Sequence, residues 1–310
     1  MLHPARVLLR ILLLVPLGGC SIENYAIDKL GDALSASGKT FASDDDPEFV
    51  SEAVPFSLKL IESLLESRPE HGPLLLAATR GFTQYSWAFV QQKAERLETI
   101  DLAASEELRH RAQKLYLRAR GYGLRALELA HPGFGVRLRA DPRQAAAGLV
   151  HEDVERMYWL AAAWGGALTQ AKDSPALLAD QPLVETLLDR ALELDESFED
   201  GALHTLLVSY EGSRPGGQRG WEERSRAHFA RAVELSKGLR AGPFVALAES
   251  VSIQGQKKAE FDELIGKALA IDADKFPEAR LENLVLQARA RWLASRESEL
   301  FLEEVKEHLE

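Results

Sequence analysis

The stretch that decides the fold is RALEL, which occurs at Arg125–Leu129 and again at Arg190–Leu194. Two close variants follow it, RAVEL at Arg231–Leu235 and KALAI at Lys267–Ile271. Each copy ends a segment whose apolar residues recur at intervals of three and four, which is the spacing of one face of an α-helix. Chance recurrence in a chain rich in alanine, leucine and glutamate is the alternative. Four copies, each at the end of such a segment, make that alternative the weaker one.

The spacing of these copies predicts a repeat built from pairs of helices. The last two intervals are close to the tetratricopeptide repeat (TPR) period of about 34 residues, and the first is near twice that period. Ser225, Phe229 and Ala232 match the small, aromatic and alanine positions of the second TPR helix, although the first helix lacks its aromatic at the expected spacing. Strand signals are nearly absent. We therefore expect an all-α fold, a TPR-like helical repeat stack (α-solenoid) of about ten or eleven helices.

The N-terminal residues resemble a bacterial lipoprotein signal. Val7–Leu17 is apolar, but it is shorter than the about 20 residues that a membrane span requires, and Arg10 interrupts it. LGGC follows and ends at Cys20, the one cysteine of the chain. This motif resembles the lipobox, in which the cysteine is lipidated after the preceding residues, here 1–19, are removed. We expect Cys20 to anchor the mature protein; an ordinary secretory signal with an incidental cysteine is the alternative.

The rest of the sequence is expected to form a tether and one domain. Residues 20–45 are predicted to be an N-terminal tether with a small helix, and residues 46–310 the TPR-like helical domain. Ser21 follows Cys20 in place of the aspartate that signals retention at the inner membrane. We therefore expect a periplasmic protein anchored in the inner leaflet of the outer membrane. Asp44–Asp46 is expected to cap a helix rather than to bind a metal, since negative charge is favourable at a helix N-terminus.

Charge and motifs argue against nucleic-acid binding and against an enzyme. The formal net charge of −11 is unfavourable for binding nucleic acid. His151 and Glu152 lack the second histidine of a zinc-binding helix. Gly121–Gly123 lacks the third glycine of a dinucleotide loop, and Arg214–Gly217 is not followed by the Lys-Ser/Thr pair of a phosphate loop. We expect no catalytic residue, no metal and no cofactor.

Glycines and aromatic residues share several predicted helices. A glycine inside a helix costs about 1 kcal/mol relative to alanine, so a packing or functional reason is expected. One hypothesis is an apolar pocket with a few polar groups, and close helix packing with the aromatic residues in the core is the alternative. The ligand-pocket candidates are Gly81, Phe82, Gln84, Tyr85, Phe89, Tyr122, Tyr158, Trp159 and Trp164.

Several separated blocks of the chain resemble the TatT family, the TPR-containing lipoproteins associated with tripartite ATP-independent periplasmic (TRAP) transporters. The resemblance extends from about Asp46 to Phe301. Its blocks are VPFSLKLIESLL (Val54–Leu65), GFTQYSWAFV (Gly81–Val90), YWLAAAWGGAL (Tyr158–Leu168), DGALHTLLVSYEGSRPGG (Asp200–Gly217) and RARWLASRESELF (Arg289–Phe301).

The resemblance implies a helical periplasmic lipoprotein that partners a TRAP solute-binding protein. It also implies that the protein assists uptake of a small apolar or amphipathic organic acid. A homo-oligomer, with a trimer as one form, is left open. The alternative function is an adaptor for outer-membrane protein or cell-wall assembly, because lipidated helical repeats also serve in that role.

Overall fold

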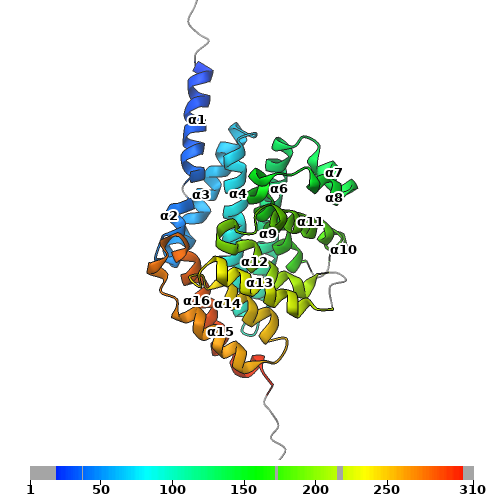
Figure 1. Cartoon of the computed structure of the whole chain (residues 1–310). Helices are drawn as coiled ribbons and strands as arrows, with labels where there is room; N and C mark the ends of the chain where they lie inside the picture. Colours follow the sequence, from blue (N-terminus) through cyan, green and yellow to red (C-terminus); the bar gives the residue numbers. More distant parts are fainter. Residues whose placement is uncertain (1–18, 37, 172–173, 215–218, 303–310) are drawn as a thin grey trace, which may run out of the picture.

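The structure is a computed structural model that describes residues 19–36, 38–171, 174–214 and 219–302 (Figure 1). Over these ranges every regular element is helical and no strand occurs, so the prediction of an all-α fold is confirmed. Residues 1–18 of the expected signal peptide lie outside the described residues. None of the described helices has both the length and the apolar character needed to cross a membrane.

The described chain contains α-helices α1 to α17, more segments than the ten or eleven expected, because prolines and glycines begin several short ones. The N-terminal part contains α1 (Gly19–Ala36), α2 (Gly38–Ala42), α3 (Pro47–Ser67), α4 (Gly72–Tyr85), the π-helix η2 (Ser86–Gln91), α5 (Gln92–Leu97) and α6 (Leu102–Ala130). The middle part contains α7 (Phe134–Ala140), α8 (Pro142–Ala147), the 3-10 helix η3 (His151–Asp153), α9 (Val154–Thr169), α10 (Pro175–Leu178), α11 (Gln181–Leu194), α12 (Phe198–Tyr210) and the 3-10 helix η4 (Glu211–Ser213). The C-terminal part contains α13 (Trp221–Leu235), α14 (Gly242–Leu247), the π-helix η5 (Ala248–Ser252), α15 (Lys258–Ala270), the 3-10 helices η6 (Ala273–Lys275) and η7 (Pro277–Ala279), α16 (Arg280–Ser295) and α17 (Glu297–Leu300).

The four repeat copies occupy corresponding places in the fold. They form the C-terminal ends of α6, α11, α13 and α15, and the last copy extends one residue past α15. The helices α4, α9, α12 and α14 precede these four helices in the chain, with only short segments between, and they contact one another in order: α4 contacts α9, α9 contacts α12 and α12 contacts α14. The recurring sequence therefore occurs at the C-terminal end of a helix in all four places.

The N-terminal region, for which a tether with one small helix is expected, is helical over most of the residues described. It contains α1 and α2, and Cys20 lies in the first turn of α1. The second half of α1 packs on α4, and the Arg68 Nε donates a hydrogen bond to the Asp28 Oδ1 at 2.7 Å. The first half extends beyond the rest of the molecule in Figure 1. The predicted cap is present, since the Asp46 carboxylate accepts hydrogen bonds from the Glu48 and Phe49 amides at the start of α3.

Close helix packing accounts for two of the glycines that lie inside helices. A Cβ added at Gly166 on α9 would come within 2.5 Å of the Tyr116 ring on α6. A Cβ at Gly81 on α4 would come within 2.7 Å of Leu58 on α3. Larger residues would push these helices apart, so the packing offsets the unfavourable helix propensity of glycine.

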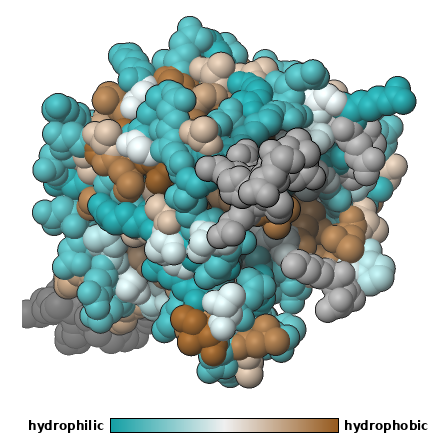
Figure 2. All heavy atoms as spheres, turned by 90° about the horizontal axis from the view of Figure 1, so that it is seen from below, coloured by the Kyte–Doolittle hydropathy of each residue, from teal (hydrophilic) through white to brown (hydrophobic). Residues whose placement is uncertain are grey.

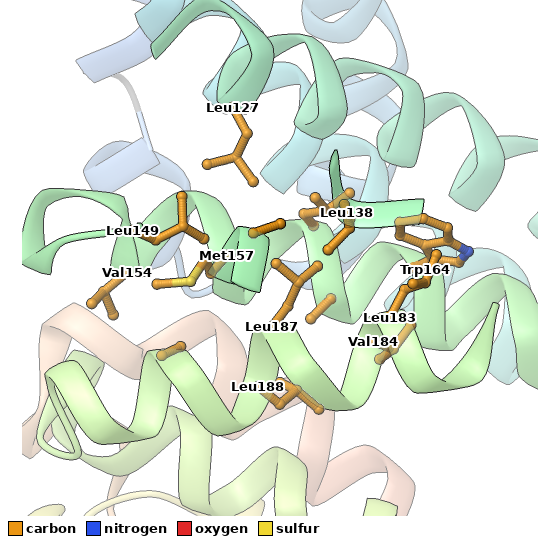
Figure 3. Close-up of a cluster of buried hydrophobic side chains, with 14 of the residues drawn as sticks. Leu127, Leu138, Leu149, Val154, Met157, Trp164, Leu183, Val184, Leu187 and Leu188 are labelled. Atoms are coloured by element: carbon orange, nitrogen blue, oxygen red, sulfur yellow. The ribbon is translucent and has the colours of Figure 1, made fainter. Parts of the chain in front are cut away.

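The largest apolar cluster lies among α6, α7, α8, α9, α11 and α12 (Figure 3). Leu127, Met157 and Leu187 belong to it and are fully buried. A second cluster lies among α14, α15 and α16, and a third joins α3, α4 and α6. Hydrophilic residues cover most of the face seen from below, with hydrophobic residues in separate patches (Figure 2).

The helix α16 lies beside the N-terminal helices, which brings the N-terminal and C-terminal parts of the described chain together (Figure 1). It contacts α2 and α3, and the Arg289 guanidinium on α16 donates to the Glu95 carboxylate on α5 at 2.6 Å. The Arg280 side chain donates to the Ser43 carbonyl oxygen at 3.2 Å. The helix α16 and the N-terminal helices therefore support each other, although they are far apart in the sequence.

Candidate functional site

Charged side chains from several successive helices meet where α4, α9, α12 and α16 approach one another. Arg80 on α4 pairs with Glu155 on α9 at 3.5 Å. Arg240, which precedes α14, pairs with two carboxylates, one at the start of α12 at 3.0 Å and one on α16 at 2.5 Å. Glu199 interacts electrostatically with both arginines. We call this group the Glu199 cluster, and it consists of Arg80, Glu155, Glu199, Asp200, Arg240 and Glu282.

Glu199 has the most perturbed carboxyl group of the cluster. Burial raises its pKa to about 7, and the neighbouring Glu155 and Glu282 act in the same direction, while Arg240 and Arg80 oppose the shift. The residue is nevertheless exposed to water. The raised pKa shows that protein lies on several sides of the Glu199 carboxyl group and hinders solvation of its charge, although part of the residue is exposed. Such perturbed groups are more frequent at functional sites than elsewhere.

The backbone at this position is strained. Glu199, Asp200 and Gly201 have consecutive positive φ angles of 42°, 55° and 92°. Glycine adopts this conformation readily, whereas non-glycine residues pay of order 1–3 kcal/mol. The strain turns the chain sharply at the start of α12 and presents two adjacent carboxylates to Arg240 and its neighbours.

A second charged group lies nearer the C-terminal end of α16, and its carboxylate side chains are more deeply buried. The Arg289 guanidinium donates to Glu249 at 2.8 and 2.6 Å and to Glu95 at 2.6 Å. Burial raises the pKa of Glu249, with Glu95 adding to the shift and Arg289 opposing it. Burial opposes protonation of Arg289, but Glu249 and Glu95 outweigh it and raise the pKa of the guanidinium. We call Arg289, Glu95 and Glu249 the Arg289 network.

Two π-helical segments lie next to these charged groups. The segment η2 interrupts the long helix formed by α4 and α5, and η5 follows α14 and contains Glu249. A π-helical turn inserts an extra residue into the helix and rotates the following side chains, and it occurs frequently at functional sites. Here η2 contains the aromatic residues Trp87 and Phe89, and η5 contains Glu249.

Six of the pocket candidates remain accessible. Gln84 is exposed, and Gly81, Tyr85, Phe89, Tyr122 and Tyr158 are half-buried. The Tyr85 and Phe89 rings are tilted against each other with centroids 5.8 Å apart. Tyr158 packs against Phe198 with ring centroids 5.2 Å apart. Burial raises the pKa of the Tyr158 hydroxyl, with Glu199 and Glu282 of the cluster adding to the shift.

The other aromatic candidates pack mainly in the core. Phe82, Trp159 and Trp164 are 3 %, 6 % and 1 % exposed. Phe82 is stacked on Tyr122 with ring centroids 6.0 Å apart, and the Tyr122 hydroxyl donates to Glu62 at 2.9 Å. The indole nitrogens of Trp159 and Trp164 find no hydrogen-bond partner among the described residues.

The sequence analysis did not identify the charged groups. Glu199, Arg240, Glu249 and Arg289 are spread over most of the C-terminal half, and no motif connects them. One sequence signal could have indicated a buried charge: a charged residue within an otherwise apolar helical segment. Glu249 in FVALAESVS has this pattern. Among the described residues, no three histidine, cysteine, aspartate or glutamate side chains are grouped as metal ligands would be.

Comparison with known proteins connects this fold to a transport system. Residues 43–301 match the family described as the TRAP transporter T-component. This family supplies an accessory component of TRAP transporters, which implies a periplasmic or membrane-associated location, and it is not a known family of enzymes. An uncharacterized protein of Treponema pallidum is 28 % identical over 303 residues, covering 92 % of this chain and 94 % of the relative. The family match spans most of the helical fold, and the chain therefore belongs to the TRAP transporter T-component family.

Proposed function

We propose that this protein is a periplasmic accessory lipoprotein that docks a TRAP solute-binding protein. It then helps to deliver a small apolar or amphipathic organic acid. In this proposal Cys20, at the start of α1, is lipidated and anchors the protein in the inner leaflet of the outer membrane. The helices act as a TPR-like stack that presents one surface to the partner. Membership of the T-component family supports the transporter link.

The observation that favours docking is the composition and exposure of the Glu199 cluster. Its four carboxylates outnumber its two guanidinium groups, so it has a net negative charge. The side chains of Asp200 and Glu282 are 48 % and 40 % exposed, and Glu199 is exposed as well. Charge complementarity of this kind steers association and fixes the orientation of the partner. We propose that a basic patch of the solute-binding protein binds here.

The accessible aromatic candidates are proposed to contact the organic acid. Tyr158 lies near the proposed docking site, because the charges of Glu199 and Glu282 add to the effect of burial in raising the pKa of its hydroxyl. Tyr85 and Phe89 lie on α4 and η2, and α4 packs directly on the helix of Tyr158. Aromatic rings with a few polar groups suit a ligand that has an apolar body and a charged end.

The test of docking is a charge reversal at Glu199. Association of the mature protein with the solute-binding protein of its transporter is measured by surface plasmon resonance. Glu199→Lys is expected to weaken binding by about tenfold or more at low salt, mainly through slower association, because electrostatic steering is lost. Glu278→Lys is the matched control, since Glu278 is an exposed residue of η7 outside the cluster and undergoes the same charge change.

The outcomes separate this proposal from its alternative. Equal binding by the two variants would remove the Glu199 cluster from the interface. If no solute-binding protein is recovered with the protein from cross-linked cells, the docking proposal itself is wrong. Loss of outer-membrane integrity on deletion of the gene, with solute uptake unchanged, would instead support the adaptor function.

A further inference from the structure

The exposed side of α6 carries a row of positive charges. From residue 110 to residue 125 the exposed residues of this helix are His110, Arg111, Lys114, Arg118, Gly121 and Arg125. Four of them are arginine or lysine and none is acidic, although acidic residues outnumber basic ones by 48 to 37 in the whole chain. Residues three, four and seven apart lie along one side of a helix. We call Arg111, Lys114, Arg118 and Arg125 the α6 basic face.

The chain itself neutralises little of this charge. Arg111, Lys114 and Arg125 have no ion-pair partner among the described residues. Arg118 lies 3.5 Å from the Glu62 carboxylate, which also pairs with a lysine of α3 at 2.6 Å. The α6 basic face therefore keeps a net positive charge, and an acidic surface would be complementary to it.

Aromatic rings hold two of the four basic side chains in place. The Arg118 guanidinium lies over the Phe82 ring, 5.4 Å from its centroid, and the Arg125 guanidinium lies over the Tyr122 ring at 5.5 Å. A guanidinium group that lies on a ring can still donate hydrogen bonds from its edge. The Arg118 side chain is 47 % exposed, so its edge is accessible. Ordering of these side chains before binding lowers the entropy cost of association.

Gly121 lies between Arg118 and Arg125 on the exposed side, and no contact within the chain explains it. A Cβ added at Gly123 would come within 3.1 Å of Leu160, whereas a Cβ added at Gly121 would meet no described atom within 4 Å. Glycine is unfavourable inside a helix, so an exposed one calls for another reason. Its missing side chain lets a second backbone approach α6 closely at this point.

The geometry points to α6 as a docking surface for an acidic helix of a partner protein. Carboxylates at intervals of three and four residues on that helix would pair with the α6 basic face, and the two backbones would come closest at Gly121. A membrane surface fits less well. Helices that lie on membranes bury an apolar face, and no exposed residue of α6 from 110 to 125 has an apolar side chain. This surface is separate from the Glu199 cluster, whose charge is negative, and does not depend on docking there.

The test uses a labelled helical peptide that carries glutamates at intervals of three and four residues along one face. An analogue carries glutamine at the same positions. Fluorescence anisotropy measures the binding of each peptide to the mature protein. The glutamate peptide is expected to bind at least about tenfold more tightly than the analogue at low salt, and added salt should reduce the difference, because ions screen exposed charges.

One pair of variants tests the charge. Lys114→Glu breaks no described ion pair and is expected to weaken binding of the glutamate peptide by about tenfold or more. Lys275→Glu is the matched control, since Lys275 is an exposed residue of η6 and undergoes the same charge change. It should bind the peptide as the natural chain does.

A second pair of variants tests the close approach at Gly121. Gly121→Leu is expected to weaken the glutamate peptide by about fivefold or more, because the new side chain fills the space that the partner backbone would occupy. The midpoint of thermal unfolding should rise, since leucine has a higher helix propensity than glycine. Gly266→Leu on α15 is the control: Gly266 is also exposed, and a Cβ there would meet no described atom within 4 Å. This control should raise the midpoint without changing binding.

Several results would overturn the inference. Equal binding of the glutamate and glutamine peptides is one, and unchanged binding by both Lys114→Glu and Gly121→Leu is another. Binding to phosphatidylglycerol vesicles without binding to the peptide would assign the α6 basic face to a membrane surface instead. Self-association that Lys114→Glu abolishes, again without peptide binding, would assign it to a second copy of the chain. Glu199→Lys should bind the peptide normally, so the two docking proposals can fail independently.

Discussion

Two arginines join α16 to the rest of the molecule. Arg289 lies on α16 and pairs with Glu95 on α5, whereas Arg240 lies before α14 and pairs with Glu282 on α16. The surroundings of the two arginines differ in access to water. The carboxylates that pair with Arg289 have side chains that are 16 % and 27 % exposed. Those that pair with Arg240 are 48 % and 40 % exposed. The guanidinium groups themselves are similarly covered, at 11 % and 12 %. The two regions therefore contain the same chemical pairing, and the exposure of the carboxylates distinguishes them.

This difference decides what each pairing can do. Removing one partner of a buried ion pair leaves a charge that water cannot reach, which is strongly destabilising. Exposed carboxylates can be solvated when their partner leaves, and exposed pairs contribute little to stability. The Arg289 network is therefore suited to holding α16 against α5, and the Glu199 cluster is suited to exchanging its ion pairs for those of a docking partner.

The largest expected effect is the loss of Arg289. Arg289→Met leaves Glu95 and Glu249, which are largely covered by protein, without their cation, and the free energy of unfolding is expected to fall by about 3 kcal/mol, the lower end of the range for buried pairs. Urea denaturation followed by circular dichroism measures this change. The exposed Arg291 on the same helix provides the control, and Arg291→Met should change stability by less than about 0.5 kcal/mol.

The same region offers a stricter test of the cause. If the cost arises from uncompensated charge, then adding Glu95→Gln and Glu249→Gln to Arg289→Met should recover most of the lost stability. A triple variant as unstable as the single one would instead attribute the effect to the packing of the arginine side chain. A loss below about 1 kcal/mol in the single variant would remove the distinction between the two regions.

A smaller effect is expected at Arg240. Arg240→Met is expected to lower the free energy of unfolding by about 1–2 kcal/mol, between the values for exposed and buried pairs, because water can solvate Asp200 and Glu282. Arg240 holds the pKa of Glu199 down, so the variant should raise that pKa above about 7. Denaturation in urea and carboxyl-detected NMR titration measure the two quantities. A loss as large as that of Arg289→Met would contradict the comparison.

The helical fold could be predicted from the sequence because its signals are local. Apolar residues at intervals of three and four place RALEL and its variants on helices, and Asp46 caps α3 through its own neighbouring amides. The short helices α7 and α8 were harder to predict, since they arise from the turns at Gly133 and Pro142 within a few residues. The π-helical segments η2 and η5 have no such local signal.

The charged groups could not be predicted because their members meet only after the chain has folded. Arg289 and Glu95 are separated by most of the sequence, and their contact depends on α16 returning to α5. The aromatic candidates were found from their helical context, but periodicity alone does not distinguish Tyr158, which is half-buried, from Trp159, which is in the core. Adjacent residues of a helix point in different directions, and the packing of neighbouring helices decides which is covered.

The smallest expected effect concerns the titration of Glu199. Because its pKa in the folded protein is about 7, above the ordinary value of 4.5, the folded state binds more protons than the unfolded state between these values. Stability is therefore highest below the lower value, falls as the pH rises through this window, and levels off above it.

Glu199→Gln removes this dependence of stability on pH. The stability of the natural chain relative to the variant should decline by on the order of 1 kcal/mol or less between pH 5 and 7, since water screens an exposed carboxylate. Urea denaturation at pH 5, 6, 7 and 8 measures the decline, and Glu278→Gln should show none of it. A relative stability that is constant across this range would place Glu199 among freely solvated carboxylates and remove the evidence that the cluster surrounds it.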